Sequence, residues 1–352
     1  MRTIGLRRAA EKDWALAEGE TRAAMEAYAD GVNAFIESHR SKLPLEFTIL
    51  GTEPGPWTPV DTLAWGKVMS LFLCGNYDAE LLRARLIAGL GPEAAAQLMP
   101  PYAEEGPVIV PPEALGYSWL RGAEFLELDA AAFGAEWPRS DWGSNNWVVH
   151  GSKTATGMPL LADDMHLSLD MPSIWYENGL HGGRFNSVGY SFPGVPMVIV
   201  GHNERIAWGV TNLPADVQDF YIEKFDDPAH PAQYEFLGEW KNLEILYETI
   251  EIKDGSPETL QVLSTHHGPI MNRVLGNLPQ AEPLALQWIA LEGTYLFEGV
   301  YQINLATACD EFREALSNWD APSQYFVYAD VEGHRGYQTP GNIPIRAPGH
   351  QV

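Results

Sequence analysis

Hydrophobic positions in the first hundred residues follow the 3.6-residue period of half-buried helices. Between 14 and 39 this repeat predicts one long helix. Thr58, followed by Pro59 and an acid close behind, is a typical helix start and predicts a helix from about 58 to 74. A further helix is expected over 78–90, because a Gly-Pro pair follows directly.

The pattern changes to short β-prone runs after residue 144. Gly, Asn and Asp separate these runs, as they commonly do between strands. Strands are predicted at 146–149, 158–162, 173–180, 195–200, 206–210, 220–225 and 324–328, with one helix over 309–319. Helices followed by many strands and a mixed end predict a layered α+β fold rather than a doubly wound sheet.

Between these two regions, prolines, small residues and acids dominate, and no hydrophobic period is sustained. Such a composition is typical of a connector. We therefore predict three parts: a helical region over 1–100, a connector over 101–143 and a β-rich region over 144–352.

Composition and charge narrow the classes of function. Of the 352 residues 45% are apolar, which suffices for a large core and excludes global disorder. The 47 acidic residues outnumber the 22 basic ones, and the net charge of −25 argues against a nucleic-acid or anionic-membrane partner. No apolar run reaches the ~18 residues of a membrane span, and the first residues do not resemble a signal peptide.

Two cysteines, Cys74 and Cys309, form no CxxC pair, which excludes a zinc ribbon and a thioredoxin-type site. We expect two buried free thiols, because cysteine behaves as a small hydrophobic residue. A disulfide between the two is the alternative. The sequence contains no GxSxG, GxGxxG, P-loop or HExxH motif. The first of these absences argues against an α/β-hydrolase.

Candidate chemistry centres on Gly143 and Ser144, where the connector meets the first predicted strand. A serine hydroxyl is a weak nucleophile unless a base lies beside it. The α-amino group of the serine itself, with a pKa near 8, can serve as that base if the chain is cut just before it. Gly143 has no side chain and would let the Ser144 hydroxyl approach the preceding carbonyl in a strained geometry. On these residues alone, an ordinary turn into a strand is the simpler interpretation.

Several separate sequence blocks, in order from about residue 2 to residue 346, favour the catalytic serine over an ordinary turn. They are 7–10 (RRAA), 28–35 (YADGVNAF), 143–147 (GSNNW), 160–167 (LLADDMHL), 201–203 (GHN), 207–212 (AWGVTN), 267–269 (HGP), 328–330 (YAD) and 340–346 (PGNIPIR). Each block is weak alone. Together they resemble the penicillin amidase family of N-terminal-nucleophile hydrolases.

The resemblance implies an αββα sandwich with a helical α-chain region, expected to be incomplete at both ends of this chain. Ser144 would be the nucleophile, freed by self-cleavage of the Gly143–Ser144 bond. His166 would help to orient the serine and its amine, and the backbone N–H of Asn212 would donate to the oxyanion. The implied reaction is hydrolysis of a linear amide through an acyl-enzyme.

The resemblance also implies an apolar acyl pocket. The matching positions are Leu167, Val200 and Val210, with Ser70 and Cys74 facing the pocket from the predicted helix over 58–74. The substrate would be a small acyl-amide of the penicillin, cephalosporin or N-acyl-homoserine-lactone type. Histidine rather than glutamine at position 166 weakly favours the last two.

Calcium, in a structural role, is the only cofactor that the resemblance implies. The matching ligands are Glu80, Asp216 and Asp219, with the carbonyls of Gln218 and Pro344. Such a mixture of carboxylate and carbonyl oxygens suits a hard ion of flexible coordination. Paired acids on an acidic protein surface are also common by chance.

Three alternatives stay open. A relative with an unprocessed bond at Ser144 would be a binding protein, and a serine hydrolase with a separate Asp-His pair would act without cleavage. A transition-metal site that joins the segment 163–166 (DDMH) to His266 and His267 is disfavoured, because nothing fixes the separation of the two segments.

The resemblance further implies α and β chains from one precursor and a periplasmic or secreted location. It places a second oxyanion donor and an active-site arginine beyond residue 352. Tyr325 stands where we expect an asparagine.

Overall fold

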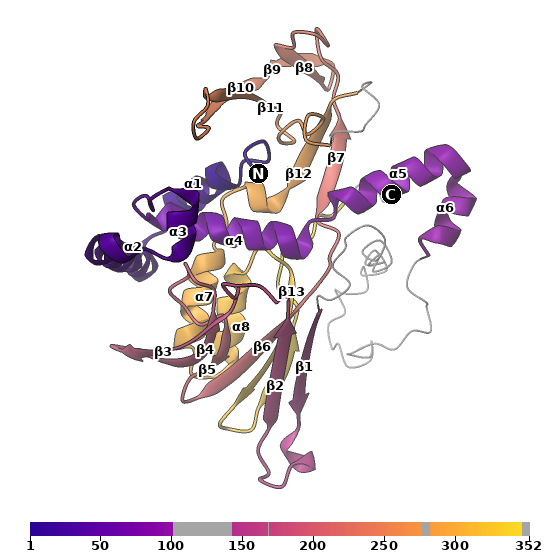
Figure 1. Cartoon of the computed structure of the whole chain (residues 1–352). Helices are drawn as coiled ribbons and strands as arrows, with labels where there is room; N and C mark the ends of the chain where they lie inside the picture. The colour runs from indigo at the N-terminus through magenta and orange to yellow at the C-terminus, as the bar shows by residue number, and fades with distance from the viewer. Residues whose placement is uncertain (101–142, 168, 276–281, 347–352) are drawn as a thin grey trace.

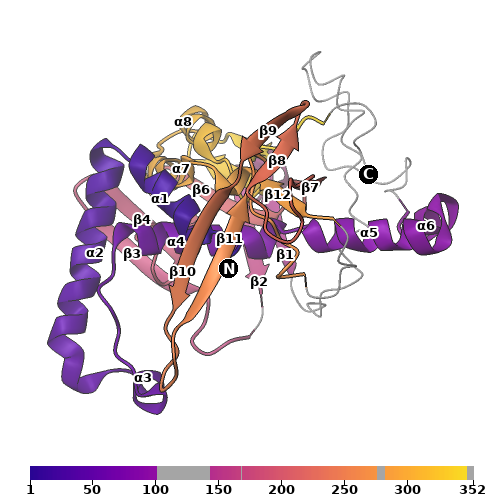
Figure 2. The ribbon, with the colours of Figure 1, turned by 90° about the horizontal axis from the view of Figure 1, so that it is seen from above.

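The computed structural model describes residues 1–100, 143–167, 169–275 and 282–346. Its N-terminal part is helical, as predicted. The helices there are α1 (Leu6–Leu16), α2 (Gly19–His39), α3 (Leu45–Leu50), α4 (Pro59–Cys74), α5 (Tyr77–Leu90) and α6 (Pro92–Leu98). From above, α2 and the α5–α6 pair lie at opposite ends of the molecule (Figure 2).

The start of α4 confirms the capping signal in the sequence. The Thr58 backbone N–H donates to Asp61 Oδ2 at 2.8 Å, and Pro59 occupies the first turn, where no amide hydrogen is needed. The single helix predicted over 14–39 is wrong. The chain turns extended at Ala17 and enters α2 through Gly19, whose φ of 56° favours glycine.

A six-stranded antiparallel sheet forms the centre of the β-rich part, in the order β14–β13–β6–β5–β4–β3. Its strands are β3 (Tyr176–Gly182), β4 (Phe185–Ser191), β5 (Val200–His202), β6 (Ile206–Asn212), β13 (Gln324–Asp330) and β14 (Arg335–Gln338). Figure 1 shows α4 crossing the middle of the molecule, with this sheet on one side and β7 and β12 on the other.

The remaining strands of the described residues form two-stranded pairs. They are β1 (Gly143–Val149) with β2 (Leu160–His166), β7 (Gln218–Ile222) with β12 (Leu284–Trp288), β8 (Gln233–Phe236) with β9 (Glu239–Asn242), and β10 (Glu244–Ile250) with β11 (Glu258–Ser264). The helices α7 (Leu296–Leu305) and α8 (Cys309–Ala315) complete the fold. The predicted α+β class is confirmed.

The two faces of the six-stranded sheet bury different partners. On one face, Trp208 and Phe326 pack with Phe312 of α8 in the largest hydrophobic cluster. Gly209 follows Trp208 and therefore faces the opposite side. There a Cβ atom at Gly209 would lie 2.8 Å from the Cβ of Asp163, so the β1–β2 hairpin approaches this face closely.

The sequence pattern did not predict every strand correctly. In the run predicted at 195–200 only Val200 is in a strand, because Pro196 cannot donate to a ladder and the preceding residues form a turn. The strands β4, β8 to β12 and β14, and the helix α7, were not predicted. The predicted connector lies outside the described residues, except for Gly143.

Candidate active site

Ser144 is the second residue of β1, at the start of the β-rich part. Antiparallel pairing sets Gly143 opposite His166 and Ser144 opposite Met165. The Ser144 Oγ donates a hydrogen bond to the Gly143 carbonyl oxygen at 2.7 Å. The hydroxyl therefore lies beside the peptide group that self-cleavage would break. Neither residue has a positive φ, so the expected backbone strain is not seen.

Gly143 is required by its neighbour across the hairpin. A Cβ atom at this position would lie 2.5 Å from Nε2 of His166, so any side chain would displace the imidazole. His166 is half exposed, on the hairpin face opposite to the Ser144 side chain. Its Nδ1 lies 3.2 Å from the Asp164 carbonyl oxygen. His166 thus contacts the peptide before Ser144 rather than the hydroxyl.

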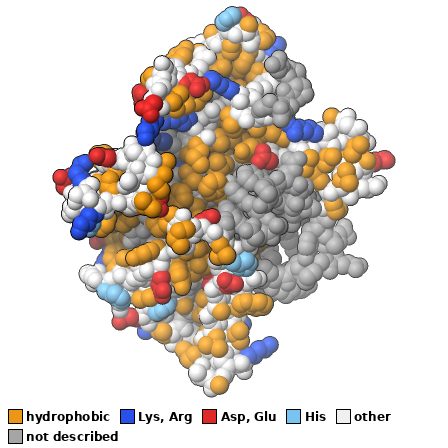
Figure 3. All heavy atoms as spheres, viewed as in Figure 1, with side chains coloured by type: hydrophobic (Ala, Val, Ile, Leu, Met, Phe, Trp, Pro, Cys, Tyr) orange, Lys and Arg blue, Asp and Glu red, His pale blue; other side chains and the backbone are white. Residues whose placement is uncertain are grey.

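A pocket of about 460 Å³ opens beside Ser144. Most of its lining is hydrophobic, contributed by α4, α7, β6 and the segment before β5. On the face shown in Figure 3, hydrophobic side chains gather in the centre of the molecule. Ser144 and Asn212 both line this pocket, so the structure brings the predicted nucleophile and the predicted oxyanion residue together.

The predicted pocket residues divide into two groups. Leu167 and Val210 line the pocket. Ser70, Cys74 and Val200 are buried and are not part of its lining, contrary to expectation. The Ser70 hydroxyl donates back to the Gly66 carbonyl at 2.9 Å within α4, which turns it away from the pocket.

Tyr325, the unexpected tyrosine, also lines the pocket. Its ring stacks on that of Tyr337, with the ring centroids 5.8 Å apart.

Asn212 uses its side chain to join two elements. Its Nδ2 donates to the Leu73 carbonyl at the end of α4 at 2.7 Å, and its Oδ1 accepts from Gln324 Nε2 of β13 at 2.9 Å. The Cys74 Sγ lies 3.7 Å from the same Oδ1. The side chain is thus occupied by the scaffold, and only the backbone of Asn212 is left for chemistry.

The ladder of β6 shows where that backbone N–H points. Leu213 N–H donates to Ser323 on the β13 side, and alternate N–H groups on a strand point to opposite sides. The N–H groups of Val210 and Asn212 therefore point away from β13. The Val210 N–H lies near the Asp163 carboxylate of the β1–β2 hairpin. The Asn212 N–H points to the same side of β6, and therefore towards the hairpin that carries Ser144.

Asp163 is a site residue that sequence reasoning considered only for a metal. It shares the inward face of the hairpin with Ser144, two residues along from Met165. Both carboxylate oxygens are buried and have no hydrogen-bond partner of normal geometry among the described residues. Burial, with a smaller contribution from nearby Asp164, raises the pKa of Asp163 to about 7, against the opposing influence of the Val210 N–H. A buried carboxyl thus lies on the same face of the hairpin as the predicted nucleophile, opposite Asn146.

A second unpredicted feature is a buried ion pair in the pocket wall. Lys67 Nζ of α4 lies 2.9 Å from Asp13 Oδ2 and donates to Thr294 Oγ1 at 3.0 Å. Asp13 accepts from the Thr294 backbone N–H at 2.7 Å. Burial raises the pKa of Asp13 and lowers that of Lys67. Six residues of helix span about 9 Å, so this polar wall lies roughly that far along α4 from Leu73 and the Asn212 end.

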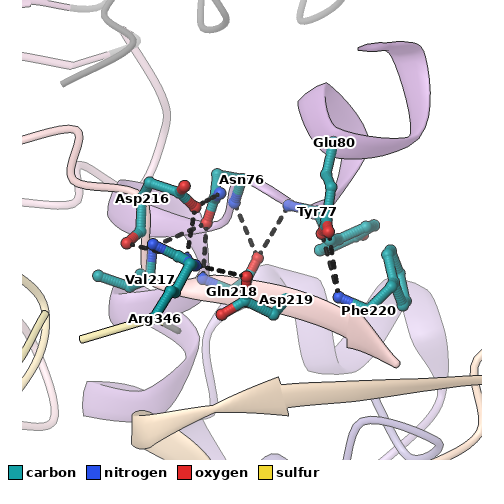
Figure 4. Close-up of polar contacts among 9 residues, drawn as sticks. All are labelled: Asn76, Tyr77, Glu80, Asp216, Val217, Gln218, Asp219, Phe220 and Arg346. Carbon is teal, nitrogen blue, oxygen red and sulfur yellow. Dashed lines mark hydrogen bonds and ion pairs between the residues drawn. The ribbon is translucent and has the colours of Figure 1, made fainter. Parts of the chain in front are cut away.

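The acidic residues predicted to hold calcium do lie near one another (Figure 4). Arg346 lies among them: its Nε is 2.7 Å from Asp219 Oδ1, and its guanidinium is 3.1 Å from Asp216 Oδ1. Glu80 accepts from the Phe220 backbone N–H. Burial, with smaller contributions from Asp219 and Asp216, raises the pKa of Glu80 to about 7.

These residues have the oxygen donors that Ca²⁺ prefers, but their arrangement does not form a coordination sphere. Within the described ranges, no three His, Cys, Asp or Glu side chains are gathered to hold a metal. The Gln218 side chain accepts from the N–H groups of Asn76 and Tyr77, while the predicted ligand is the backbone carbonyl of this residue. Pro344 lies along the same cleft as Glu80 and Asp219. In this structure the positive charge of Arg346 pairs with two of the predicted calcium ligands, Asp216 and Asp219. Calcium binding therefore stays a prediction.

The cysteines are both free thiols, Cys74 buried and Cys309 partly exposed. His267 belongs to a block without an assigned role and lies outside the pocket of Ser144. Its Nδ1 is 2.8 Å from Oε1 of buried Glu223. In the part of the chain that the structure describes, no helix has both the length and the apolar character needed to cross a membrane.

Comparison with known families decides the identity of the chain. A sequence model of penicillin amidase matches residues 1–351. The chain belongs to the penicillin amidase family. The resemblance drawn from the separate motif blocks is thereby confirmed.

Individual relatives agree with this assignment. The acyl-homoserine lactone acylase QuiP of Pseudomonas aeruginosa is 30% identical over 99% of this chain and 43% of the relative. The penicillin acylase 2 proenzyme of a Pseudomonas species is 28% identical over 98% of this chain and 45% of the relative. The chain thus spans less than half the length of these relatives.

A solved structure also resembles the chain. The thermostable penicillin G acylase from Alcaligenes faecalis superposes with a TM-score of 0.52 and 28% sequence identity, covering 58% of this chain and 36% of that one.

Proposed function

We propose that this chain forms part of an amidohydrolase that cleaves a linear acyl-amide through a self-processed N-terminal serine. The supporting observation is the position of Ser144: it begins the β-rich part, its hydroxyl contacts the preceding peptide, and it opens onto an apolar pocket. The relatives named above are acylases of penicillins and of acyl-homoserine lactones, which agrees with amide hydrolysis.

Self-cleavage would use the contact between Ser144 and Gly143. The Ser144 Oγ attacks the Gly143 carbonyl carbon, the C–N bond breaks, and the hydroxyl proton goes to the departing nitrogen. This acyl shift leaves the Ser144 α-amine free and the Gly143 carbonyl in an ester with Oγ. Water then hydrolyses the ester, which releases the Gly143 carboxylate and restores the Ser144 hydroxyl. With its proton on Nδ1, facing Asp164, His166 can accept a hydrogen bond from that amine through Nε2.

Amide hydrolysis would then follow two proton transfers through the amine. The free amine takes the Ser144 hydroxyl proton while Oγ attacks the substrate carbonyl carbon. The Asn212 N–H donates to the developing oxyanion, an interaction that can contribute several kcal/mol. The ammonium group returns the proton to the leaving nitrogen as the C–N bond breaks. Water repeats the sequence on the acyl-enzyme.

The pocket supports an acyl group that is apolar along most of its length. Burial of each methylene would contribute about 0.8 kcal/mol to binding. The wall formed by Lys67 and Asp13 would limit how far an acyl chain extends along α4. Leu167 and Val210 would contact the acyl group near the reacting carbonyl.

We further propose the complete αββα sandwich of the family. Packing of α7 and α8 on one face of the six-stranded sheet, and of the β1–β2 hairpin on the other, supports three of its layers. We also propose an α chain and a β chain from one precursor and a periplasmic or secreted location, on family membership alone.

The test is to replace Ser144 in the full-length protein. Ser144→Ala should yield one uncut chain with no measurable hydrolysis of acyl p-nitroanilides, because both reactions need Oγ. Ser152→Ala, in a surface turn of the same hairpin, is the matched control and should be cut and active. Hydrolysis by the Ser144→Ala protein would favour a separate catalytic serine, and an unaltered protein that stays uncut and inactive would favour a binding protein.

A further inference from the structure

Gln324 is the partner that fixes Asn212. In the β6–β13 ladder these residues lie directly opposite each other, as a pair whose backbones do not exchange hydrogen bonds. The side chains of such a pair lie close together on the same face of the sheet. Gln324 Nε2 donates to Asn212 Oδ1 at 2.9 Å and to the Ser323 carbonyl at 2.7 Å. Both of its amide hydrogens are therefore used.

The chain of contacts continues from Asn212 to the end of α4. Asn212 Nδ2 donates to the Leu73 carbonyl at 2.7 Å, so one side chain links β13, β6 and α4. Gln324 is 4% exposed, and both amides line the pocket of Ser144. Loss of the Gln324 contact would leave Asn212 Oδ1 with only the weak Cys74 thiol contact, at 3.7 Å, among the described residues, so the amide would be held less firmly.

We propose that Gln324 is a positioning residue for the reaction, acting through Asn212. This inference rests on the proposed function, in which the Asn212 backbone N–H donates to the oxyanion. Gln324 and the Leu73 carbonyl hold the two ends of the Asn212 amide, and this fixes the last residue of β6. A strand end is otherwise free to twist, and an oxyanion donor is effective only when its direction is set beforehand.

The position of the contact decides which kinetic constant responds. Gln324 acts on the donor to the transition state, while the acyl group is held by the apolar walls of the pocket. Misdirecting the Asn212 N–H should therefore lower kcat and leave KM nearly unchanged. Loss of an oxyanion donor typically costs about 100-fold or more in kcat, and a misdirected donor should cost about 10- to 100-fold.

The experiment uses Gln324→Glu in the full-length, processed enzyme. The new carboxylate keeps the shape of the amide but cannot donate to Asn212 Oδ1 when ionised. We expect kcat on one acyl p-nitroanilide to fall about 10- to 100-fold per titrated active site, with KM changed less than about twofold. At lower pH the protonated carboxyl can donate again, so the kcat ratio of the variant to the unaltered enzyme should rise towards acid.

Gln233→Glu is the matched control. Gln233 also donates its Nε2 to an asparagine Oδ1 directly across an antiparallel pair, that of Asn242 at 2.9 Å, but on the exposed β8–β9 hairpin. Its kcat and KM should stay unchanged. Gln324→Met, of similar length and without charge, repeats the test if the carboxylate prevents folding and should lower kcat about tenfold.

Three outcomes separate this inference from the proposed function. An unaltered kcat in Gln324→Glu, with Ser144 confirmed as the processed nucleophile, would overturn the positioning role alone. A rise in KM without a fall in kcat would assign Gln324 to substrate binding and overturn it too. Failure of both variants to give soluble, cut protein would show that Gln324 serves the fold and would likewise overturn it.

Discussion

At the scale of single residues, the site combines small and polar groups whose positions follow from the hairpin register. Gly143 is opposite His166, and the absence of a side chain lets the imidazole lie against the Gly143–Ser144 peptide, for which we propose self-cleavage. Ser144 is the next residue along β1, and its side chain points inward, towards the pocket. One residue of shift in β1 would send the hydroxyl to the exposed face, so the register of this hairpin is essential to the chemistry.

Asp163 gives a prediction on pH dependence. Its folded-state pKa of about 7 lies above the ordinary value of 3.8, so the stability linked to its protonation is fully present below about pH 4 and is lost as the pH rises through 7. Asp163→Asn removes the charge and keeps an acceptor for the Val210 N–H. We expect this variant to be more stable than the unaltered protein at pH 8 by about 2–4 kcal/mol, because each pKa unit corresponds to about 1.4 kcal/mol.

Thermal unfolding of the full-length protein at pH 4 and pH 8 measures this effect. The difference between the two proteins should be small at pH 4 and large at pH 8. Asp170→Asn, at an exposed carboxylate, should show neither effect. An Asp163→Asn protein that is less stable at pH 8 would mean that the buried carboxylate is ionised and stabilised there.

At the scale of elements, α4 connects the start of the chain to the site. Its first turn is capped as the sequence predicts, its middle lines the pocket with Gly66 and Lys67, and its end meets Asn212. Gly66 is where the pocket has room: among the described residues outside α4, a Cβ atom there would meet only Leu296, at 4.0 Å.

Gly66→Leu should therefore shorten the pocket without disturbing the helix. Leucine is a better helix former than glycine by up to about 1 kcal/mol, so stability should not fall. Each displaced methylene of the acyl chain costs about 0.8 kcal/mol, and kcat/KM on a long acyl p-nitroanilide should drop at least tenfold relative to a short one. Gly89→Leu, on α5 with nothing within 4 Å, is the control. An unchanged preference for chain length would place the acyl group elsewhere.

Local signals in the sequence predicted local structure. The Thr58 cap, the helices over 58–74 and 78–90 and the hairpin strand after Ser144 follow from residues close together in the chain. What the sequence could not show depends on distant segments. Asp13, Lys67 and Thr294 come from three parts of the chain, and no spacing relates them.

The same limit explains the errors in the predicted pocket. Ser70 and Cys74 lie on the predicted helix, but which face of α4 meets the pocket is decided by packing against α1 and β6. The buried Asp163 on the hairpin of Ser144 likewise carries no signal of its own. Its one clue was the Asp163-Asp164 pair inside a motif block, and only tertiary packing distinguishes the buried acid from the exposed one.

At the scale of the whole molecule, the ion pairs of Arg346 join the end of the described chain to β7 and to the segment before it. Arg346→Gln would leave Asp216, Asp219 and Glu80 close together, with Arg83 as a remaining positive charge that lowers the pKa of Asp216 against the larger effect of burial. We expect the free energy of unfolding to fall by about 2 kcal/mol, the typical value of hydrogen bonds to charged groups. Millimolar CaCl₂ should restore part of that loss, because the remaining oxygen donors suit calcium.

Thermal unfolding in EDTA and in CaCl₂ provides the measurement. Arg205→Gln, which breaks an exposed ion pair with Glu332, is the control and should not respond to calcium. A variant whose melting temperature is the same in both solutions would argue against a cation site in this cluster. If the unaltered protein is strongly stabilised by calcium, Arg346 must leave Asp216 and Asp219 when the ion binds.

The account depends on a free amine at Ser144 in the working enzyme. Intact-mass spectrometry of purified, active full-length protein measures this directly, when fresh enzyme is compared with enzyme quenched during turnover of an acyl p-nitroanilide. We predict a β chain whose first residue is Ser144, and a gain of one acyl group on that chain in the quenched sample. Active protein in which Gly143 and Ser144 are still joined, or an acyl group carried by another chain, would contradict the account.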